Sequence, residues 1–567
     1  MTMLKHRFAR VLSRSLLVLA LAQTALAGCQ AKREDAAPTS APDRTTPAAP
    51  EPAEVAVGPG VVTRQQDLSA LAPSTTMEAR KRGGAMVGGG YGGSTGTLAF
   101  DRQSGEGGEG YKDYGQNGWT EVGKDHLSTL SVDVDTASYT IARRKLTEGQ
   151  LPPTAAVRVE EFVNYFRYGY STAGVSAARP FAVSMDAAPH PFNRQRLLLR
   201  VGVATKVKSL AERKPAHLVF LVDTSGSMHS PDKLDLAKRA LRILVDNLKD
   251  SDTVALVTYA GNTRVVLPAT GLDRRNAIAA AIEDLSAGGS TAMASGIDLA
   301  YQEAMKGLAP GVESRVIIVS DGDANVGPTS HDEILATIAN KVKEGITLST
   351  IGFGMGNYQD ETMEQLADKG DGANFYIDSL SQAKRVFQEQ LGSTLEVVAQ
   401  DVKLQVDFDA AQVARYRLVG YENRDLADHD FRDDKVDAGE IGAGHQVTAI
   451  YEVELAPGAT GGDGMATLRV RHKEPKGTTA TEAGFGFERA NLATSFDAAS
   501  ADFRFAFAVA AFADVLRGAQ DAEHWDLAAI QALAEAGAGT EADRRELVTL
   551  IGKARQLRGG TKTAIAQ

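Results

Sequence analysis

Short apolar runs and longer amphipathic segments alternate through the middle of the chain. Residues 218–222 (LVFLV) and 315–320 (RVIIVS) have continuously apolar centres, a pattern typical of strands that are covered on both faces of a sheet. Residues 233–248 instead carry apolar side chains at helical spacing. Strands that alternate with helices predict a mostly parallel sheet with helices on both faces. The other elements expected in this region are strands at 253–259 and 347–353 and helices at 273–285, 292–306, 331–343, 359–369 and 380–391.

The pattern differs on both sides of this region. Before it, residues 128–135 alternate like a strand, whereas residues 136–146 and 157–166 have helical spacing. After it, alternating segments are separated by Gly-rich and Asp-rich loops, which predicts antiparallel β-structure. We expect strands within 181–205 to join strands within 400–490 in one β-sandwich, because neither set alone is large enough to bury a good core.

The start of the chain carries a targeting signal. Basic residues between positions 5 and 14 precede an apolar run that ends in residues 26–29 (LAGC). This is a secretory signal that is too short to read as a membrane-spanning helix. The motif resembles the lipobox of bacterial lipoproteins, and the only cysteine of the chain, Cys29, closes it. The resemblance implies that Cys29 is lipidated and becomes the new N-terminus, and that Gln30 directs the protein to the outer membrane.

The segment after the signal has a biased composition. Residues 31–60 are rich in Ala, Pro, Thr, Ser and Glu, and residues 83–118 are rich in Gly. Neither stretch has a hydrophobic period or enough bulky apolar residues to offset the entropy of ordering. We therefore expect a mostly disordered tether. The expected organisation is a signal peptide at 1–28, the tether at 29–123, an N-terminal flanking α+β region at 124–214, the α/β domain at 215–395, a β-rich domain at 396–495 and a C-terminal helical region at 496–567.

Composition narrows the classes of function. The 567 residues are 43% hydrophobic and 23% charged, so most of the chain can bury cores. A formal net charge of −11 argues against a general nucleic-acid binder, which would show a basic face. The single cysteine excludes an intrachain disulfide, and the ten histidines form no zinc-type cluster.

Carboxylates and hydroxyls follow the predicted ends of two buried strands. Asp223 comes directly after the first strand, with Ser225 and Ser227 at the spacing DxSxS, and Asp321 follows the second strand. Ligands of such sheets bind beyond the carboxyl ends of the strands, so both carboxylates should reach one crevice. An all-oxygen set suits Mg²⁺, Mn²⁺ or Ca²⁺ and not zinc. The sequence therefore predicts a divalent-metal site.

Thr291 completes a set that resembles the metal-ion-dependent adhesion site (MIDAS) of von Willebrand factor type A domains. The resemblance implies that Ser225 and Ser227 ligate the ion directly and that Thr291 binds directly or through water. It also implies that Asp223 and Asp321 act mostly through bound water and hydrogen bonds to the hydroxyls. The expected ion is Mg²⁺, with Mn²⁺ and Ca²⁺ as alternatives.

Three further stretches resemble the bacterial YfbK-type von Willebrand A lipoproteins. They are residues 131–139 (SVDVDTASY), 157–166 (VRVEEFVNYF) and 503–506 (FRFA). The resemblance implies an α/β fold, with a doubly wound von Willebrand A domain flanked by a β-sandwich-like region and C-terminal helices. It transfers architecture more than activity, because the function of this family is poorly defined.

Other readings of individual residues carry less weight. Asp133 and Asp135 could form a second acidic site, but we interpret them as alternating solvent-facing positions. As nucleophiles, Ser225 and Ser227 would need a nearby base, and no Gly-x-Ser-x-Gly elbow surrounds them, so no enzyme activity is expected. Residues 352–356 (GFGMG) lack a dinucleotide fingerprint and are predicted to form a loop near the metal edge.

These observations lead to one expected function. We expect a lipid-anchored cell-envelope protein that uses its metal ion to coordinate an Asp or Glu carboxylate of a protein partner. By resemblance, the last helix of the α/β domain (380–391) could slide to switch affinity. The alternative is a metal-independent structural scaffold of an envelope complex. No nucleic-acid partner is expected, and the outer membrane is favoured over the inner membrane as the site of anchoring.

Overall fold

The computed structural model describes most of the chain beyond residue 101. These residues belong to the second of two units into which the chain divides, Met1–Gly93 and Ser94–Gln567. The expected signal peptide, Cys29, Asp133 and Thr291 lie outside the described residues. None of the described helices combines the length and apolarity needed to span a lipid bilayer. The described residues are 102–104, 108–132, 134–176, 179–209, 211–290, 292–322, 331–390, 395–459 and 464–565.

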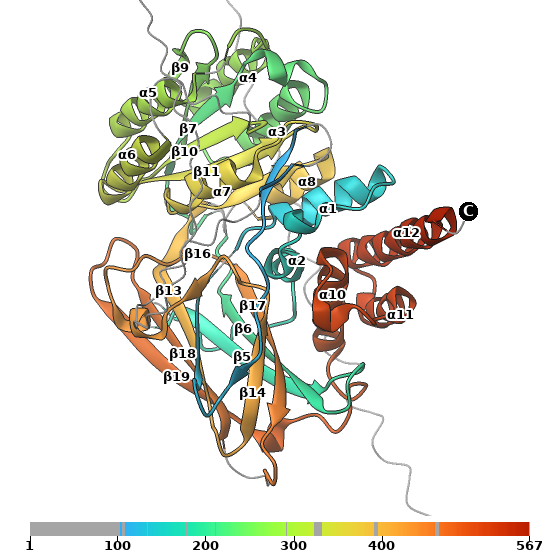
Figure 1. The fold of residues 1–567 in the computed structure, drawn as a ribbon. Helices are drawn as coiled ribbons and strands as arrows, with labels where there is room; N and C mark the ends of the chain where they lie inside the picture. Colours follow the sequence, from blue (N-terminus) through green and yellow to red (C-terminus); the bar gives the residue numbers. More distant parts are fainter. Residues whose placement is uncertain are drawn as a thin grey trace, which may run out of the picture. The chain divides into compact units, whose positions relative to one another are not determined.

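A six-stranded sheet forms the centre of the α/β domain (Figure 1). Its strand order is β12-β11-β10-β7-β8-β9, and all neighbours are parallel except the edge pair of β8 and β9. The mostly parallel sheet agrees with the predicted fold class. The strands are β7 Ala216–Asp223, β8 Thr253–Tyr259, β9 Arg264–Gly271, β10 Glu313–Ser320, β11 Ile346–Phe353 and β12 Asn374–Ile377.

Helices cover both faces of this sheet because the side chains of its central strand alternate between two cores. Leu218, Phe220 and Val222 pack in one core with α3 and α4, and Val219 and Leu221 pack in the other with α5, α6 and α7. The expected last helix begins as α8 and continues as a π-helical turn over Arg385–Glu389. The helices are α3 Leu234–Asn247, α4 Arg275–Glu283, α5 Met293–Lys306, α6 His331–Lys343, α7 Asp360–Asp368 and α8 Leu380–Lys384.

Sequence patterns missed the two edge strands of this sheet. Strand β9 is partly exposed and contains Pro268, and a proline normally argues against a strand except at an edge. Strand β12 has only four residues, Asn374–Ile377, which is too short for a recognisable hydrophobic period.

Two antiparallel sheets enclose a third core and form a β-sandwich. Strand β6 pairs with β17, and β4 pairs with β13, so strands from both sides of the α/β domain share each sheet. This pairing confirms the expected joint sandwich. One sheet contains β15 Asp425–Leu426, β4 Leu127–Ser131, β13 Val397–Phe408, β18 Gly464–Lys473, β19 Ala480–Glu488 and β16 Ile441–Gly442, and the other contains β3 Thr120–Glu121, β14 Val413–Val419, β17 Gln446–Leu455, β6 Arg196–Thr205 and β5 Phe181–Pro189.

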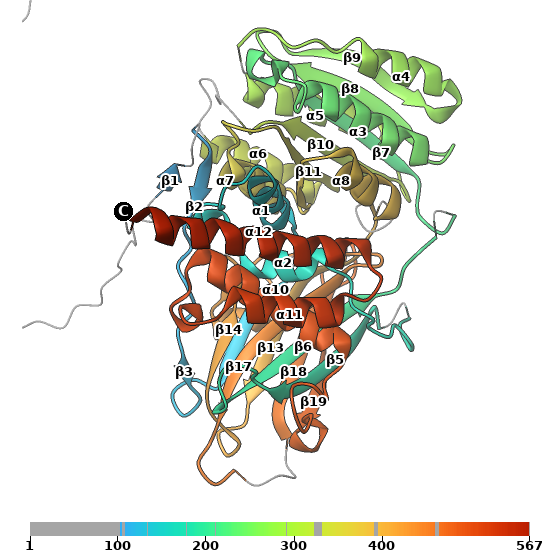
Figure 2. The same cartoon turned by 90° about the vertical axis from the view of Figure 1, so that its right-hand side faces the viewer.

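A layer of helices packs on the second of these sheets (Figure 2). Phe505 and Phe512 of α10 share a core with Leu198 of β6 and Ile450 of β17. The C-terminal helical region expected over residues 496–567 ends in two helices, which are separated by Gly539, where φ is 57°. The helices of this layer are α1 Ala137–Thr147, α2 Val159–Tyr165, α10 Ala501–Arg517, α11 Leu527–Ala538 and α12 Ala542–Ile565.

Residues 108–123 are ordered, so the prediction of a disordered tether is wrong for this segment. Glu109 and Tyr111 are completely buried. Strand β2 (Gly110–Lys112) is tied to the α/β domain, since the Gly110 amide donates to the Tyr358 carbonyl over 3.0 Å. The segment looked disordered because separate contacts hold it, such as those of buried Glu109 and Tyr111 and the pairing of β3 with β14, and these contacts give no apolar period. We call residues 108–112 the N-terminal strap.

Asp135 is also not solvent-facing, which corrects the prediction for this residue. Its side chain is only 7% exposed. One carboxylate oxygen accepts from the Asn374 amide over 2.8 Å, and the other lies 3.2 Å from Nη2 of Arg424. Asp135 therefore links the α/β domain to the sandwich, a role that alternation along a strand does not reveal.

Candidate metal centre

Asp223 lies at the carboxyl end of β7 and is completely buried. Its Oδ1 accepts a hydrogen bond from the Ser225 amide over 2.8 Å. Its Oδ2 accepts from the hydroxyls of Ser320 and Tyr259 over 2.9 and 3.1 Å. Three elements therefore orient one carboxylate at the edge of the sheet, as expected where parallel strands end together.

The two predicted serine ligands lie side by side. Oγ of Ser225 is 3.0 Å from Oγ of Ser227. Their turn is held by the Gly226 amide, which donates to the Gly289 carbonyl over 3.0 Å. Gly289 has a φ of 94°, and a Cβ there would approach the Gly261 nitrogen to 3.0 Å, so glycine suits this close contact. The turn that carries the serines therefore packs against the loop that contains Gly289.

Asp321 brings the second carboxylate to the same edge. It follows β10 and is completely buried, as is Asp223. Its Oδ2 accepts from Nζ of Lys233 over 3.0 Å and from Nδ2 of Asn357 over 3.1 Å. Asn357 belongs to the loop after β11, so the prediction that this loop lies near the metal edge is confirmed. No sequence motif singled out Lys233.

Burial shapes the electrostatics of the site. Burial, with a smaller contribution from the neighbouring Asp321, raises the pKa of Asp223 to about 6 against the lowering effect of hydrogen bonds from Ser225. A buried carboxylate beside a second carboxylate is stabilised in its charged form by a cation bound near both.

The donor set fits a hard divalent cation. Asp223, Asp321, Ser225 and Ser227 offer only carboxylate and hydroxyl oxygens, which suit Mg²⁺, Mn²⁺ or Ca²⁺. Ser227 is half-buried, and the adjoining Gly226 and Ser290 are exposed, so an outside group can approach this edge. The structure therefore brings together four of the five predicted ligands, and Thr291 lies outside the described residues.

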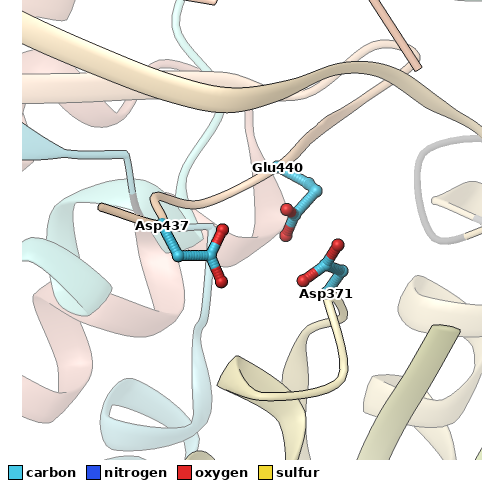
Figure 3. A group of neighbouring side chains, drawn as sticks. All are labelled: Asp371, Asp437 and Glu440. Carbon is cyan, nitrogen blue, oxygen red and sulfur yellow. The ribbon is translucent and has the colours of Figure 1, made fainter. Parts of the chain in front are cut away.

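A separate acidic cluster was not predicted from the sequence. Among the described residues, carboxylate oxygens of Asp371, Asp437 and Glu440 all lie within 4.8 Å of one another (Figure 3). Asp371 precedes β12 in the α/β domain, whereas Asp437 and Glu440 precede β16 in the sandwich. Because these loops are distant in sequence, local patterns could not have revealed the cluster.

The carboxyl groups of this cluster resist ionisation. Burial, together with repulsion from Asp437 and Asp368, raises the pKa of Asp371 to about 7. Burial and the charge of Asp371 also raise the pKa of Glu440. Arg315 and Lys369 oppose these shifts without cancelling them.

We expect Asp371→Asn to increase the free energy of unfolding at pH 8 and to change it little at pH 3.5. The folded chain binds the Asp371 proton more tightly than the unfolded chain does, so this group reduces stability as pH rises from 3.8 towards about 7. Asparagine also tolerates the left-handed backbone at this position, where φ is 46°.

Urea denaturation at the two pH values measures this effect. Asp298→Asn, at an exposed position on α5, is the control and should change stability equally at both pH values. A lower stability of Asp371→Asn at pH 8 would contradict the repulsion between the carboxylates.

Comparison with known proteins identifies families and a relative to which the chain is similar. Residues 217–389 match the von Willebrand factor type A domain, residues 393–557 match the C-terminal part of uncharacterized protein YfbK, and residues 106–200 match a family described as von Willebrand factor. Uncharacterized protein YfbK of Escherichia coli (strain K12) is 38% identical in an alignment of 465 positions that covers 78% of this chain and 80% of YfbK.

Two further proteins are similar over smaller parts or at lower identity. Inter-alpha-trypsin inhibitor heavy chain H3 of Bos taurus is 26% identical over 217 residues, which make up 37% of this chain and 22% of that protein. A solved structure, von Willebrand factor type A from Catenulispora acidiphila, is 20% identical with a TM-score of 0.40, and the alignment covers 68% of this chain and 91% of that one.

Proposed function

Because the chain belongs to the YfbK family and contains a von Willebrand factor type A domain, we propose that this domain binds a divalent metal ion and uses it to hold a protein partner. Asp223, Ser225, Ser227, Thr291 and Asp321 would hold the ion, which we take to be Mg²⁺. When bound, the ion would supply a coordination position for an Asp or Glu carboxylate of the partner. The proposal includes no catalytic step.

One observation carries the proposal. Two buried carboxylates and two hydroxyls from different strand ends converge on the carboxyl edge of the sheet. The protein orients these oxygens through its own hydrogen bonds, since Ser320 and Tyr259 hold Asp223, and Asn357 holds Asp321. An oriented oxygen set beside an exposed loop is suited to binding an ion that also contacts an outside ligand.

A capture experiment tests this function. The full chain and its Asp223→Ala variant serve as bait for solubilised cell envelope, in Mg²⁺ and in chelator. The expected result is a partner that binds the natural chain in Mg²⁺ and is lost in chelator and in the variant. Equal capture in all conditions would instead favour a metal-independent scaffold.

We also propose that lipid on Cys29 anchors the protein in the outer membrane. Cys29→Ser should abolish the incorporation of radiolabelled palmitate and release the chain from the membrane fraction, because a polypeptide without its acyl chains loses the apolar anchor. Gln30→Asp is the matched variant, which should keep the label and move from the outer to the inner membrane. Palmitate labelling of Cys29→Ser would refute the anchor.

A further inference from the structure

Lys233 reaches the candidate metal centre from the start of α3. Its Nζ lies 3.0 Å from Oδ2 of Asp321 and 2.6 Å from Oδ1 of Asn357. Nδ2 of Asn357 donates to the same Asp321 oxygen over 3.1 Å. The lysine side chain is 8% exposed and that of Asp321 is completely buried. A fixed positive charge therefore lies against one of the predicted metal residues.

The fold holds this lysine in a shaped space. Gly354, on the loop after β11, has a φ of 80°, and a Cβ there would lie 2.1 Å from Cγ of Lys233. Glycine at this position therefore leaves room for the aliphatic part of the lysine. The loop is itself anchored, because Arg144 donates to the Gly354 carbonyl over 3.0 Å and the Gly356 amide donates to Glu109 over 3.0 Å.

The charge of Lys233 has two effects on the site. It stabilises the buried Asp321 carboxylate, which would otherwise be poorly solvated. It also repels a divalent ion that uses the same carboxylate, since two cations a few ångströms apart interact strongly in a partly buried site. Both effects make the binding of a metal ion less favourable.

We propose that Lys233 is a built-in counter-ion of the metal centre, which holds Asp321 in position and lowers the affinity of the site for divalent metal. This inference rests on the proposed metal binding. It predicts a site that responds to changes in metal concentration, because its affinity is held below what its oxygen ligands alone would provide.

The test compares the full chain with Lys233→Met and Lys233→Gln. Calorimetric titration with Mg²⁺, after chelation and removal of the chelator, should show binding that is tighter by about tenfold or more in both variants. Thermal unfolding in chelator should show a lower melting temperature for Lys233→Met, because Asp321 has lost its counter-ion. Lys233→Gln removes the positive charge but keeps a hydrogen-bond donor for Asp321, so it reports the effect of the charge alone. It also serves as the test variant if Lys233→Met does not fold.

Lys238→Met is the matched control on the same helix. This half-buried lysine donates to the Glu283 carbonyl and should leave Mg²⁺ affinity unchanged. If the natural chain binds Mg²⁺ and the Lys233 variants bind it equally or more weakly, the proposal that Lys233 lowers metal affinity is refuted. The proposed metal binding is then retained. If neither the natural chain nor the variants bind Mg²⁺, both proposals fail.

Discussion

Asp223→Asn should weaken Mg²⁺ binding by more than about 100-fold, since even residues that only support metal ligands change affinity by about 10- to 100-fold. The substitution keeps the size of the side chain and removes one of the two buried negative charges of the site. It also replaces an acceptor of two hydroxyl hydrogen bonds, from Ser320 and Tyr259, by an amide. Calorimetric titration of the full chain measures the loss.

A control separates this effect from a general change of charge. Asp284→Asn removes a carboxylate at an exposed position of the same domain and should leave Mg²⁺ affinity unchanged. Thermal unfolding in chelator should show that Asp223→Asn still folds, since the repulsion between Asp223 and Asp321 is relieved. Undiminished Mg²⁺ binding by this folded variant would exclude Asp223 from the site.

Glu109→Gln should lower the free energy of unfolding by about 3–5 kcal/mol, which is typical when one partner of a buried ion pair is removed. The Glu109 carboxylate lies 2.7 Å from Nη2 of Arg144 and 2.8 Å from Nζ of Lys145, and all three side chains are at least nine-tenths buried. It also accepts from the Tyr111 hydroxyl over 2.8 Å. The variant would remove the buried counter-charge that these two buried cations share. Urea denaturation near neutral pH measures the difference.

The pH dependence of this loss has a defined sign. Burial acts to raise the pKa of Glu109, but Arg144, Lys145 and hydrogen bonds outweigh it, so the pKa lies below its ordinary value of 4.5. A lowered pKa contributes stability above 4.5 that is lost as pH falls further, so the natural chain and the variant should converge in acid. Glu148→Gln, which removes a partly exposed partner of the same arginine, should cost less than about 1 kcal/mol. Equal losses of unfolding free energy in Glu109→Gln and Glu148→Gln would contradict the role of burial.

Much of the fold followed from local patterns. The strand at 218–222 and the helix at 233–248 were predictable because each apolar position reports which face of its own element is buried. The pairing of β6 with β17 was also predictable, since each set of strands was too small to bury a core alone. The short or exposed edge strands β9 and β12 carry little of this signal and were missed.

The sequence by itself determined the α/β domain and the predicted ligands Asp223, Ser225, Ser227 and Asp321, because strand ends and ligand spacing lie within short segments. The tertiary structure alone decided which distant groups meet these residues or form separate clusters. Lys233 meets Asp321, the N-terminal strap is ordered around Glu109, and Asp371 faces two carboxylates of the sandwich. Each such contact joins segments that are far apart in the chain, and a residue's local sequence contains no information about the charge that folding will bring beside it.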